Sequence, residues 1–425
     1  MVLSAIAYLD RTNISIAGVQ IGSEFKIDHS HLGWVFSAFL IGYATFQIPG
    51  GVLARRFGPR RVLALSVLWW GLFTALTALV SPSVRGALLL LVLVRFSMGA
   101  GEATMYPAAS QFVERWFPVD ERGKANGIIF GGVGIGAGFT PPLLTSVILS
   151  YGWRASFWLC AAIGVAAGLV WYWIARDTPE QHRLVSETEL RVIVAGRDNT
   201  QRGDSSILSQ TMGGLSTPWK DIFRSREIIA MTLSYFTYGY VAWIFFSWFY
   251  IYLAEVRGLN LKTSALYSML PFIAMTLGCL IGGAASDWLA RHSSVRVGRC
   301  LLPAFALGCT AILLLVGSQA DNSRIASVVL ACGAGALYVS QSCFWSVTAD
   351  VSGEHAGVAS GVMNMGGQIG GAVTASLTPL IASRFGWNAS FFTAAILATG
   401  GAVAWLVVDP GARIAKNNES GRTQS

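Results

Sequence analysis

The sequence predicts an all-α membrane protein with twelve transmembrane helices, arranged as two pseudo-symmetric six-helix bundles. Three observations lead to this fold class: the composition, the recurrence of long apolar runs, and a repeat that relates the two halves. Hydrophobic residues make up 53% of the 425-residue chain and charged residues only 12%, whereas an ordinary soluble domain contains about 25% charged residues. A soluble fold cannot bury that much apolar surface, so we expect lipid to cover part of it.

Twelve apolar runs approach the ~20 residues that an α-helix needs to cross a bilayer, and charged or Gly/Pro/Asn clusters separate them. The runs of the first half lie at residues 1–22, 32–54, 62–81, 86–109, 124–149 and 155–175. Those of the second half lie at residues 228–253, 264–290, 301–318, 325–349, 356–381 and 389–408. The sequence therefore predicts an N-terminal bundle over 1–175, a cytoplasmic linker over 176–227, a C-terminal bundle over 228–408 and a cytoplasmic tail over 409–425.

The two halves are related in sequence. Residues 151–157 read YGWRASF at the start of the sixth run, and residues 385–391 read FGWNASF at the start of the twelfth. These segments are 234 residues apart, and Gly127 and Gly361 keep the same spacing. A duplicated six-helix unit has a pseudo-two-fold axis along the membrane normal, with substrate sites near the midplane between the halves. The repeat therefore favours a transporter that works by alternating access.

The distribution of positive charge predicts the orientation, because cytoplasmic loops retain Lys and Arg. One set of loops, together with the linker and the tail, contains 21 of the 30 Lys and Arg residues. The opposite loops contain seven, namely Lys26, Arg85, Arg154, Arg257, Lys262, Arg324 and Arg384. We expect a multi-pass protein of the cell inner (plasma) membrane with both termini in the cytoplasm. The net charge of +8 is then a topology signal and not a nucleic-acid-binding surface.

Four charged residues lie inside the predicted spans: Asp10 and Arg11 in the first, and Arg95 and Glu102 in the fourth. A charge at the centre of a bilayer costs roughly 2.5–3.5 kcal/mol on insertion scales, so such residues are candidates for function. Arg95 and Glu102 are about two helical turns apart and point to the same side of their helix. In the functional interpretation, the arginines attract a carboxylate and the acids carry a coupling proton. In the alternative, Arg95 and Glu102 only neutralise each other as a structural pair.

Uncharged polar and aromatic side chains in other spans can complete a binding cavity. These candidates are Tyr8, Tyr43, Gln47, Ser342, Trp345, Asn364 and Gln368. A Tyr or Trp in a membrane protein is more often a packing or interfacial residue than a ligand contact. Asn364 is a better candidate, because it lies in the glycine-rich segment 361–368, where helices approach closely and a buried amide needs a partner.

Four segments of the chain stand out as motifs: residues 8–15 (YLDRTNIS), 33–39 (GWVFSAF), 95–107 (RFSMGAGEATMYP) and 116–123 (WFPVDERG). Together they resemble the major facilitator superfamily and, within it, the anion:cation symporter family. The resemblance extends over essentially the whole chain and implies the major facilitator fold. Similar family members import organic anions, such as sugar acids of the galactonate and glucarate type or aromatic carboxylates, by proton symport.

The resemblance also implies roles for individual residues. The residues that match substrate contacts are Arg11, Tyr8, Tyr43, Ser342, Trp345 and Asn364. The residues that match proton-coupling positions are Asp10, Glu102 and Arg95, the last being the arginine coupled to the glutamate. We expect the partners to be a small organic anion, protons and the lipid bilayer, with no nucleic acid, no metal and no cofactor, and we expect a monomer.

Two departures from the family pattern affect these expectations. In the segment 51–61, which resembles the gating motif of the superfamily, Arg55 stands where an Asp is usual, whereas Asp287 keeps the acid in the second half. We therefore expect a weaker gate on the cytoplasmic side. Val133 stands where sugar-acid symporters have a Gln that faces the substrate. Its loss predicts a substrate with fewer hydroxyls than a sugar acid, such as an aromatic or short aliphatic carboxylate.

Other functions stay open at this stage. An exporter or antiporter of the same fold, for metabolites or drugs, has the same overall pattern, although Arg11 and Arg95 favour anions. A membrane-embedded enzyme is expected to show a His-rich or Asp-rich cluster within its spans, and a sensor usually carries a soluble output domain; the sequence shows neither. A transporter, not an enzyme, is therefore the prediction.

Overall fold

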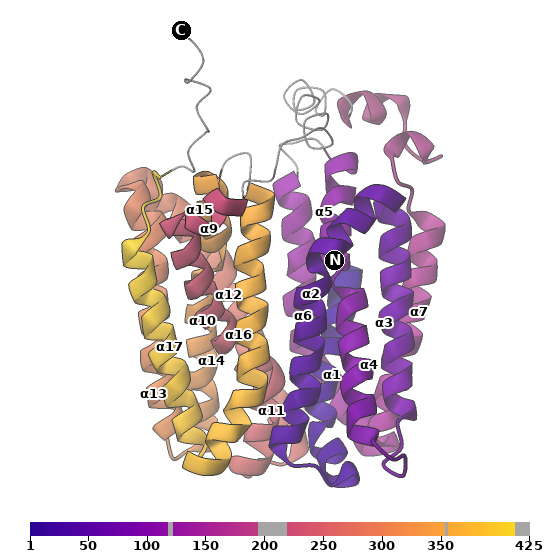
Figure 1. Ribbon diagram of the computed structural model, residues 1–425, viewed down its shortest axis with the longest axis vertical. Coiled ribbons are helices and arrows are strands. Elements are labelled where there is room, and N and C mark those ends of the chain that lie inside the picture. Colours follow the sequence, from indigo (N-terminus) through magenta and orange to yellow (C-terminus); the bar gives the residue numbers. More distant parts are fainter. Residues whose placement is uncertain (118–121, 194–218, 353–355, 413–425) are drawn as a thin grey trace.

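The computed structural model describes residues 1–117, 122–193, 219–352 and 356–412, and its regular structure in these ranges is helical (Figure 1). The first half consists of α1 (Val2–Phe25), α2 (His29–Phe57), α3 (Pro59–Leu79), α4 (Ala87–Glu102), α5 (Met105–Trp116), α6 (Arg122–Tyr151) and α7 (Trp153–Ile174). The second half consists of α10 (Arg226–Ser247), α12 (Leu261–His292), α13 (Leu302–Gln319), α14 (Ser323–Val339), α15 (Gln341–Ser352), α16 (Ala356–Phe385) and α17 (Trp387–Val407). Short segments are η1 (Pro179–Gln181), α9 (Trp219–Arg224), α11 (Phe249–Ile251), η2 (Tyr252–Val256) and η3 (Val297–Leu301).

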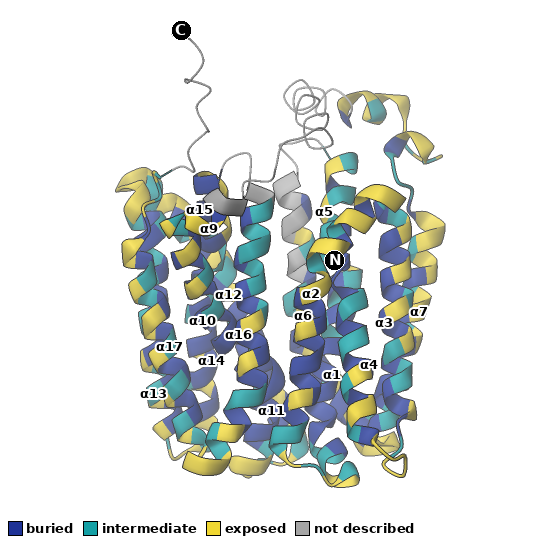
Figure 2. Ribbon diagram, in the orientation of Figure 1, coloured by how far each residue is buried: buried dark blue, intermediate teal, exposed yellow. Residues whose placement is uncertain are grey.

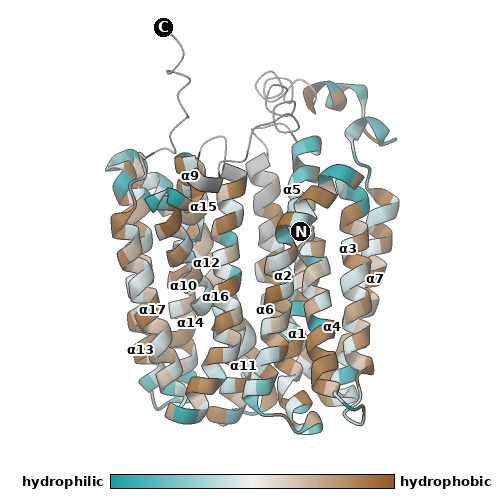
Figure 3. Cartoon of the chain, viewed as in Figure 1, coloured by the Kyte–Doolittle hydropathy of each residue, from teal (hydrophilic) through white to brown (hydrophobic). Residues whose placement is uncertain are grey.

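Ten helices of the described chain are long and apolar enough to cross a membrane, if α4 with α5 and α14 with α15 each count as one. Two further helices are less apolar: α1, with 24 residues that include Asp10, Arg11 and Glu24, and α16, with 30 residues rich in glycine. At about 1.5 Å per residue both exceed the ~30 Å hydrocarbon core. The predicted all-α fold is confirmed. Figure 3 shows hydrophobic residues along the helices and hydrophilic residues gathered near their ends.

The predicted spans 86–109 and 325–349 are each broken in the structure. In the first, the Thr104 N–H donates to the carbonyl of Gly101, three residues earlier, and Ser340 makes the same turn in the second. Such a tight turn ends an α-helix. The residues on both sides stay apolar, so the break leaves no mark in the hydropathy pattern.

Within each half, the helices pack in matching pairs. In the first half α2 packs on α4, α3 on α7 and α1 on α6; in the second half α12 packs on α14, α13 on α17 and α10 on α16. Glycine permits a close approach of the backbones in both the α2–α4 pair and the α12–α14 pair. A Cβ at Gly42 of α2 would lie 2.2 Å from the carbonyl oxygen of Phe96, and one at Gly278 of α12 would lie 2.1 Å from that of Gly335. The packing of the duplicated unit is thus preserved in both halves.

The two halves meet along α2 with α16 and α6 with α12. Hydrogen bonds that join the halves gather at the end that carries the seven predicted extracytoplasmic Lys and Arg residues. There the Ser37 hydroxyl donates to the Ala372 carbonyl over 2.6 Å, and the Ser15 hydroxyl donates to the Ser247 carbonyl over 2.7 Å. We call this arginine-poor end the closed end.

The opposite, arginine-rich end looks different. The last turns of α2 expose Val52, Leu53 and Phe57, and α12 exposes Trp288. Figure 2 shows that the buried residues run along the middle of the helices and that exposed residues cover the ends and the outer faces. The site described next therefore lies in the buried middle of the molecule, with a sealed end on one side.

Candidate transport site

Two helices of the first half hold the buried charges of the described chain. Asp10 and Arg11 on α1 are 1% and 4% exposed, and Arg95 and Glu102 on α4 are 2% and 0% exposed. An isolated charge is very costly in an interior of low dielectric constant. Two acids and two bases give the cluster a formal charge of zero, which offsets this cost. The structure thus brings together all four charges that the sequence places inside spans.

Arg11 and Glu102 form a direct ion pair. The Arg11 Nε atom lies 2.5 Å from Glu102 Oε1, although the residues are 91 positions apart in the chain. The pair is only half satisfied, because Arg11 Nη2 and Glu102 Oε2 are buried without a hydrogen-bond partner. A buried charged atom without a partner costs more than an ordinary lost hydrogen bond. The free Nη2 is therefore a ready donor for a second carboxylate.

Arg95 lies in the same cluster but makes no direct ion pair within the described chain. Its Nη1 is 3.0 Å from the Sδ of Met98, and its guanidinium carbon is 4.9 Å from the ring centre of Phe39. Asp10 and Glu102 act on it only through space. Arg95 and Glu102 do not form a direct ion pair in this conformation, because Arg11 reaches Glu102 from the neighbouring helix. That the two charges neutralise each other structurally remains an alternative.

Aromatic rings enclose the Arg11 guanidinium. Its carbon lies 4.6 Å from the ring centre of Tyr8, 4.6 Å from that of Tyr43 and 5.5 Å from that of Phe39. Such contacts attract a cation to the ring face. Tyr106 of α5 is a further neighbour of Arg11 that the sequence reasoning missed. These rings hold the guanidinium plane in place and exclude water from it.

Asp10 has a different environment from Glu102. Both of its carboxylate oxygens are buried without a hydrogen bond of good geometry. The uncharged side chains beside it are Thr74 of α3 and Cys160 of α7. The Cys160 thiol in turn accepts from the Asn13 amide over 3.6 Å. Sequence reasoning missed Thr74 and Cys160, because isolated polar residues on other helices carry no signal that they meet Asp10.

The second half faces this cluster with neutral side chains. Tyr8 packs against Phe246 across the interface, with ring centres 5.6 Å apart, and lies within electrostatic range of Tyr235 and Tyr338. The Gln341 amide donates to the Tyr235 hydroxyl over 3.3 Å, and its own oxygen is buried without a partner. Sequence reasoning missed these four second-half residues.

The second-half residues expected from the resemblance lie on α15 and α16. The Ser342 hydroxyl is buried without a partner, Trp345 packs on Tyr235 with ring centres 6.4 Å apart, and Asn364 is half-buried. Within the described ranges, no hydrogen bond or ion pair joins these side chains to Arg11. Their contact with a substrate remains a prediction.

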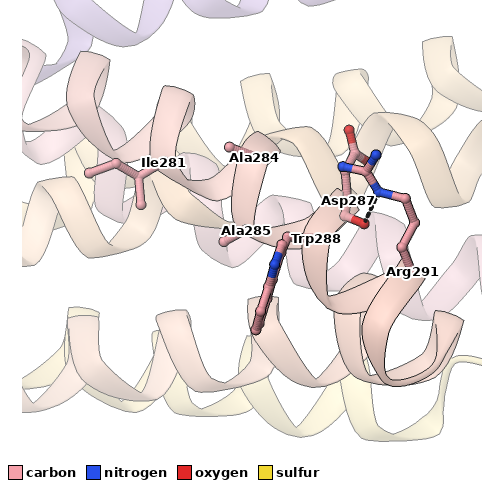
Figure 4. A pocket seen from close by; sticks show the side chains of 6 residues that line it. All are labelled: Ile281, Ala284, Ala285, Asp287, Trp288 and Arg291. Carbon is pink, nitrogen blue, oxygen red and sulfur yellow. Dashed lines mark hydrogen bonds between the residues drawn. The ribbon is translucent and has the colours of Figure 1, made fainter.

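The two expected gating residues lie near the arginine-rich end. Asp287 pairs with Arg299 over 3.1 Å, and its backbone carbonyl accepts from Arg291 Nε over 3.1 Å (Figure 4). Asp287 and Arg291 line a shallow pocket with Trp288. Arg55 is exposed at the end of α2. The structure thus leaves both gating residues accessible in this conformation.

An acid that the sequence reasoning left without a role lies beside the first gating segment. The Asp177 carboxylate accepts from the Arg60 backbone N–H over 2.9 Å, at the start of α3. An acid at this position is stabilised by the positive end of the helix dipole. Asp177 thus contacts the turn between α2 and α3, close to Arg55 in the chain.

The described residues contain no group of three or more His, Cys, Asp or Glu side chains that could hold a metal ion. The buried cluster itself offers ion pairing by the arginines, and hydrogen bonding and proton transfer at the two acids.

Comparison with known proteins gives the family of the chain. The family model described as "Major Facilitator Superfamily" matches residues 1–375. The probable sulfoacetate transporter of Cupriavidus necator is 33% identical over 407 residues, which cover 95% of this chain and 91% of that protein. The probable L-galactonate transporter of Escherichia coli is 28% identical and covers 95% and 86%. A bacterial homologue of the human lysosomal transporter Spinster superposes with a TM-score of 0.75 at 16% identity, covering 95% and 94%.

The fold and the buried charges define a multi-pass membrane transporter. The chain belongs to the Major Facilitator Superfamily. The resemblance inferred from the four sequence segments is thus confirmed, and the protein is a secondary transporter, not an enzyme.

Proposed function

We propose that the protein takes up a small organic anion across the cell inner membrane together with protons. The half-satisfied Arg11–Glu102 pair carries this proposal, because it offers an anion-binding donor and a proton-carrying acid on one guanidinium. A substrate carboxylate that binds Arg11 competes directly with Glu102. The binding of the anion and the protonation state of the acid are therefore linked.

The coupling follows from the cost of an unpaired buried charge. When the substrate takes Arg11, the Glu102 carboxylate loses its direct partner at a place that is 0% exposed. A charge left alone in such a place is strongly destabilising, and a carboxylate avoids it by taking up a proton. Asp10, whose carboxylate lies within electrostatic range of Arg95, is the second proposed proton carrier. The positive charge of Arg95 then compensates the negative charge of whichever of these two acids is ionised.

The proposed substrate is a short carboxylate with few hydroxyl groups. Relatives are named as transporters of sulfoacetate, L-galactonate and galactarate or D-glucarate, all small organic anions. Val133 offers no amide to a substrate hydroxyl. The neutral wall of Tyr235, Trp345 and Gln341 suits a ligand whose charge is concentrated at the Arg11 end. We propose that Ser342 and Asn364 contact the same, uncharged end of the substrate as this wall.

Transport is proposed to occur by rocking of the bundles 1–175 and 228–408, joined by the linker 176–227. The positive-inside pattern supports a cytoplasmic location for both termini and for the arginine-rich end. The closed end then faces outward, and the structure corresponds to an inward-facing state. When the arginine-rich end closes, Asp287 is placed to meet the positive N-terminus of α6. Arg55 cannot make the equivalent contact in the first half.

Uptake into proteoliposomes tests this proposal. The measurement uses labelled sulfoacetate, L-galactonate, D-glucarate and benzoate, with and without an inward proton gradient. We expect gradient-stimulated uptake of one class, lost in Arg11→Ala and retained in Arg85→Ala, which removes an exposed arginine from a loop at the closed end. Exchange without any effect of the gradient would instead support an exchanger or exporter of the same fold.

A further inference from the structure

A contact between a histidine and a glutamate joins the two halves at the closed end. The Nε2 atom of His29, the first residue of α2, lies 2.9 Å from Oε2 of Glu255 in η2. The side chains are 41% and 35% exposed. Solvent protons can therefore reach the imidazole, and the pair is still partly shielded from water. None of the roles proposed above uses either residue.

The His29 ring is set among side chains of the second half. It lies edge-on to Trp248, with ring centres 5.8 Å apart, and to Trp387, with ring centres 6.3 Å apart. The Trp248 indole is itself fixed, because its N–H donates to the Ala375 carbonyl over 3.1 Å. The His29 imidazole of the first half thus packs against Trp248, Glu255 and Trp387 of the second half. These contacts must break when the closed end opens.

Few charges act on this imidazole. Glu255 faces it from η2, whereas Trp248 and Trp387 contribute uncharged rings. Asp28 precedes it in the chain, and the backbone N–H of His31 lowers the pKa of that carboxyl, so Asp28 stays ionised. Asp28 is bound to His31 within the same helix turn, at 2.6 Å. Of these two acids, only Glu255 contacts the His29 imidazole from the other half.

We propose that His29 and Glu255 form a proton-operated clamp on the closed end, separate from the acids that carry the coupled protons. An unperturbed imidazole titrates at about pH 6.5. While the His29 imidazole is protonated, the pair is an imidazolium–carboxylate contact; when the imidazole is neutral, only a hydrogen bond remains. Acid on this side of the membrane thus favours closure. The inference rests on the rocking motion of the proposed function.

The expected size of the effect follows from the partial exposure of the pair. Ion pairs that are open to solvent change an equilibrium by at most about fivefold. We therefore expect deprotonation of His29 to raise the ratio of open to closed molecules about two- to fivefold. High salt reduces the effect, because it screens exposed charges.

Distance measurement between the halves tests the clamp without any substrate. Spin labels are placed at Arg85→Cys and Arg324→Cys, exposed positions in the two halves at the closed end. The background carries Cys279→Ser, Cys309→Ser and Cys332→Ser, because the other three cysteines are buried. Double electron–electron resonance in nanodiscs then gives the populations of short and long distances between pH 5.5 and 7.5.

The short-distance population of the parent protein is expected to rise as the pH falls. In His29→Gln, the change with pH in the ratio of short to long distances should be smaller by about two- to fivefold. In His29→Lys, the closed population should stay the same at all pH values tested. Glu255→Gln should act like His29→Gln. The matched control is His31→Gln, which removes a neighbouring histidine whose acid partner lies on its own helix turn, and it should respond like the parent.

A His29→Gln protein with the full pH response of the parent, or a His31→Gln protein without it, would overturn the clamp. Because no anion is present, such a result leaves the proton-coupled uptake of the proposed function untouched. Conversely, a positive result here together with failed uptake of every anion tested would retain the clamp and reject the symporter.

Discussion

The two halves of the molecule share their helix packing but differ in what they bury. Gly42 on α2 and Gly278 on α12 each permit a close approach of the backbones within matching helix pairs, α2 with α4 and α12 with α14. The first half nevertheless holds all four buried charges of the described chain, whereas the second half opposes them with Tyr235 and Gln341. Duplication has thus preserved the scaffold, and the charge chemistry belongs to one half.

This asymmetry explains how coupling can work in a moving protein. Arg11, the proposed anion-binding residue, and Asp10 and Glu102, the proposed proton carriers, lie on α1 and α4, which belong to the same half. They therefore keep their mutual geometry while the halves rock. The second half is left to recognise the uncharged part of the ligand and to close over it.

The largest expected effect is the loss of Arg11. Arg11→Ala leaves Glu102 as a buried acid without its direct partner, and breaking a buried pair in this way costs about 3–5 kcal/mol. We expect gradient-driven uptake to fall more than about a hundredfold. Arg11→Lys should give an uptake rate between those of the parent and of Arg11→Ala, because an ammonium group cannot bind two carboxylates in the planar geometry of a guanidinium. Initial uptake rates measure both, and activity of Arg11→Ala within tenfold of the parent would contradict the asymmetry.

The shared scaffold should respond equally in both halves. Gly42→Ala and Gly278→Ala each force a Cβ against a backbone carbonyl, and such overpacking typically costs about 1–3 kcal/mol. We expect similar reductions in the thermal unfolding midpoint of both purified variants. Gly308→Ala is the control, because nothing lies within 4 Å of its Cβ position. A severe effect in one half alone would show that the packing is not equivalent.

The neutral wall of the second half should affect affinity more than coupling. Gln341→Ala removes the amide that donates to Tyr235, and a hydrogen bond of this kind contributes about 0.5–1.5 kcal/mol. We expect the KM for the transported anion to rise about two- to tenfold, with stimulation by the proton gradient retained. Full uptake kinetics with and without the gradient separate the two effects. Loss of stimulation with an unchanged KM would place coupling chemistry in the second half as well.

The smallest expected effect concerns the exposed gate. Arg55→Asp restores the usual acid at the end of α2, and a charge near a helix terminus contributes about 0.3–1 kcal/mol. We expect at most about a fivefold change in the uptake rate. Asp287→Asn, in the half that has kept the acid, should change the rate in the opposite direction. A larger effect of Arg55→Asp than of Arg11→Ala would mean that gating, not binding, limits transport.

Much of the fold follows from the sequence, because a bilayer demands helices of a fixed length and a repeat reveals the halves. The four buried charges could also be recognised from the sequence, since a charge inside a membrane span is costly. The residues that these charges contact could not be predicted. Arg11 and Glu102 meet across 91 positions, and Cys160 reaches Asp10 from α7, contacts that depend on helix packing alone. The turn at Thr104 lies within an apolar run, so no change in the hydropathy pattern indicates it.

The most direct test of the account is whether anion binding itself draws a proton onto Glu102. Isothermal titration of the purified protein with the transported anion, repeated in buffers that differ in ionisation enthalpy, counts the protons taken up on binding. The account predicts uptake of up to about one proton per bound anion in the parent protein and a clear reduction in Glu102→Gln, because competition for Arg11 leaves the parent acid without its partner. Binding heats that are independent of the buffer in the parent protein would contradict the competition between substrate and Glu102.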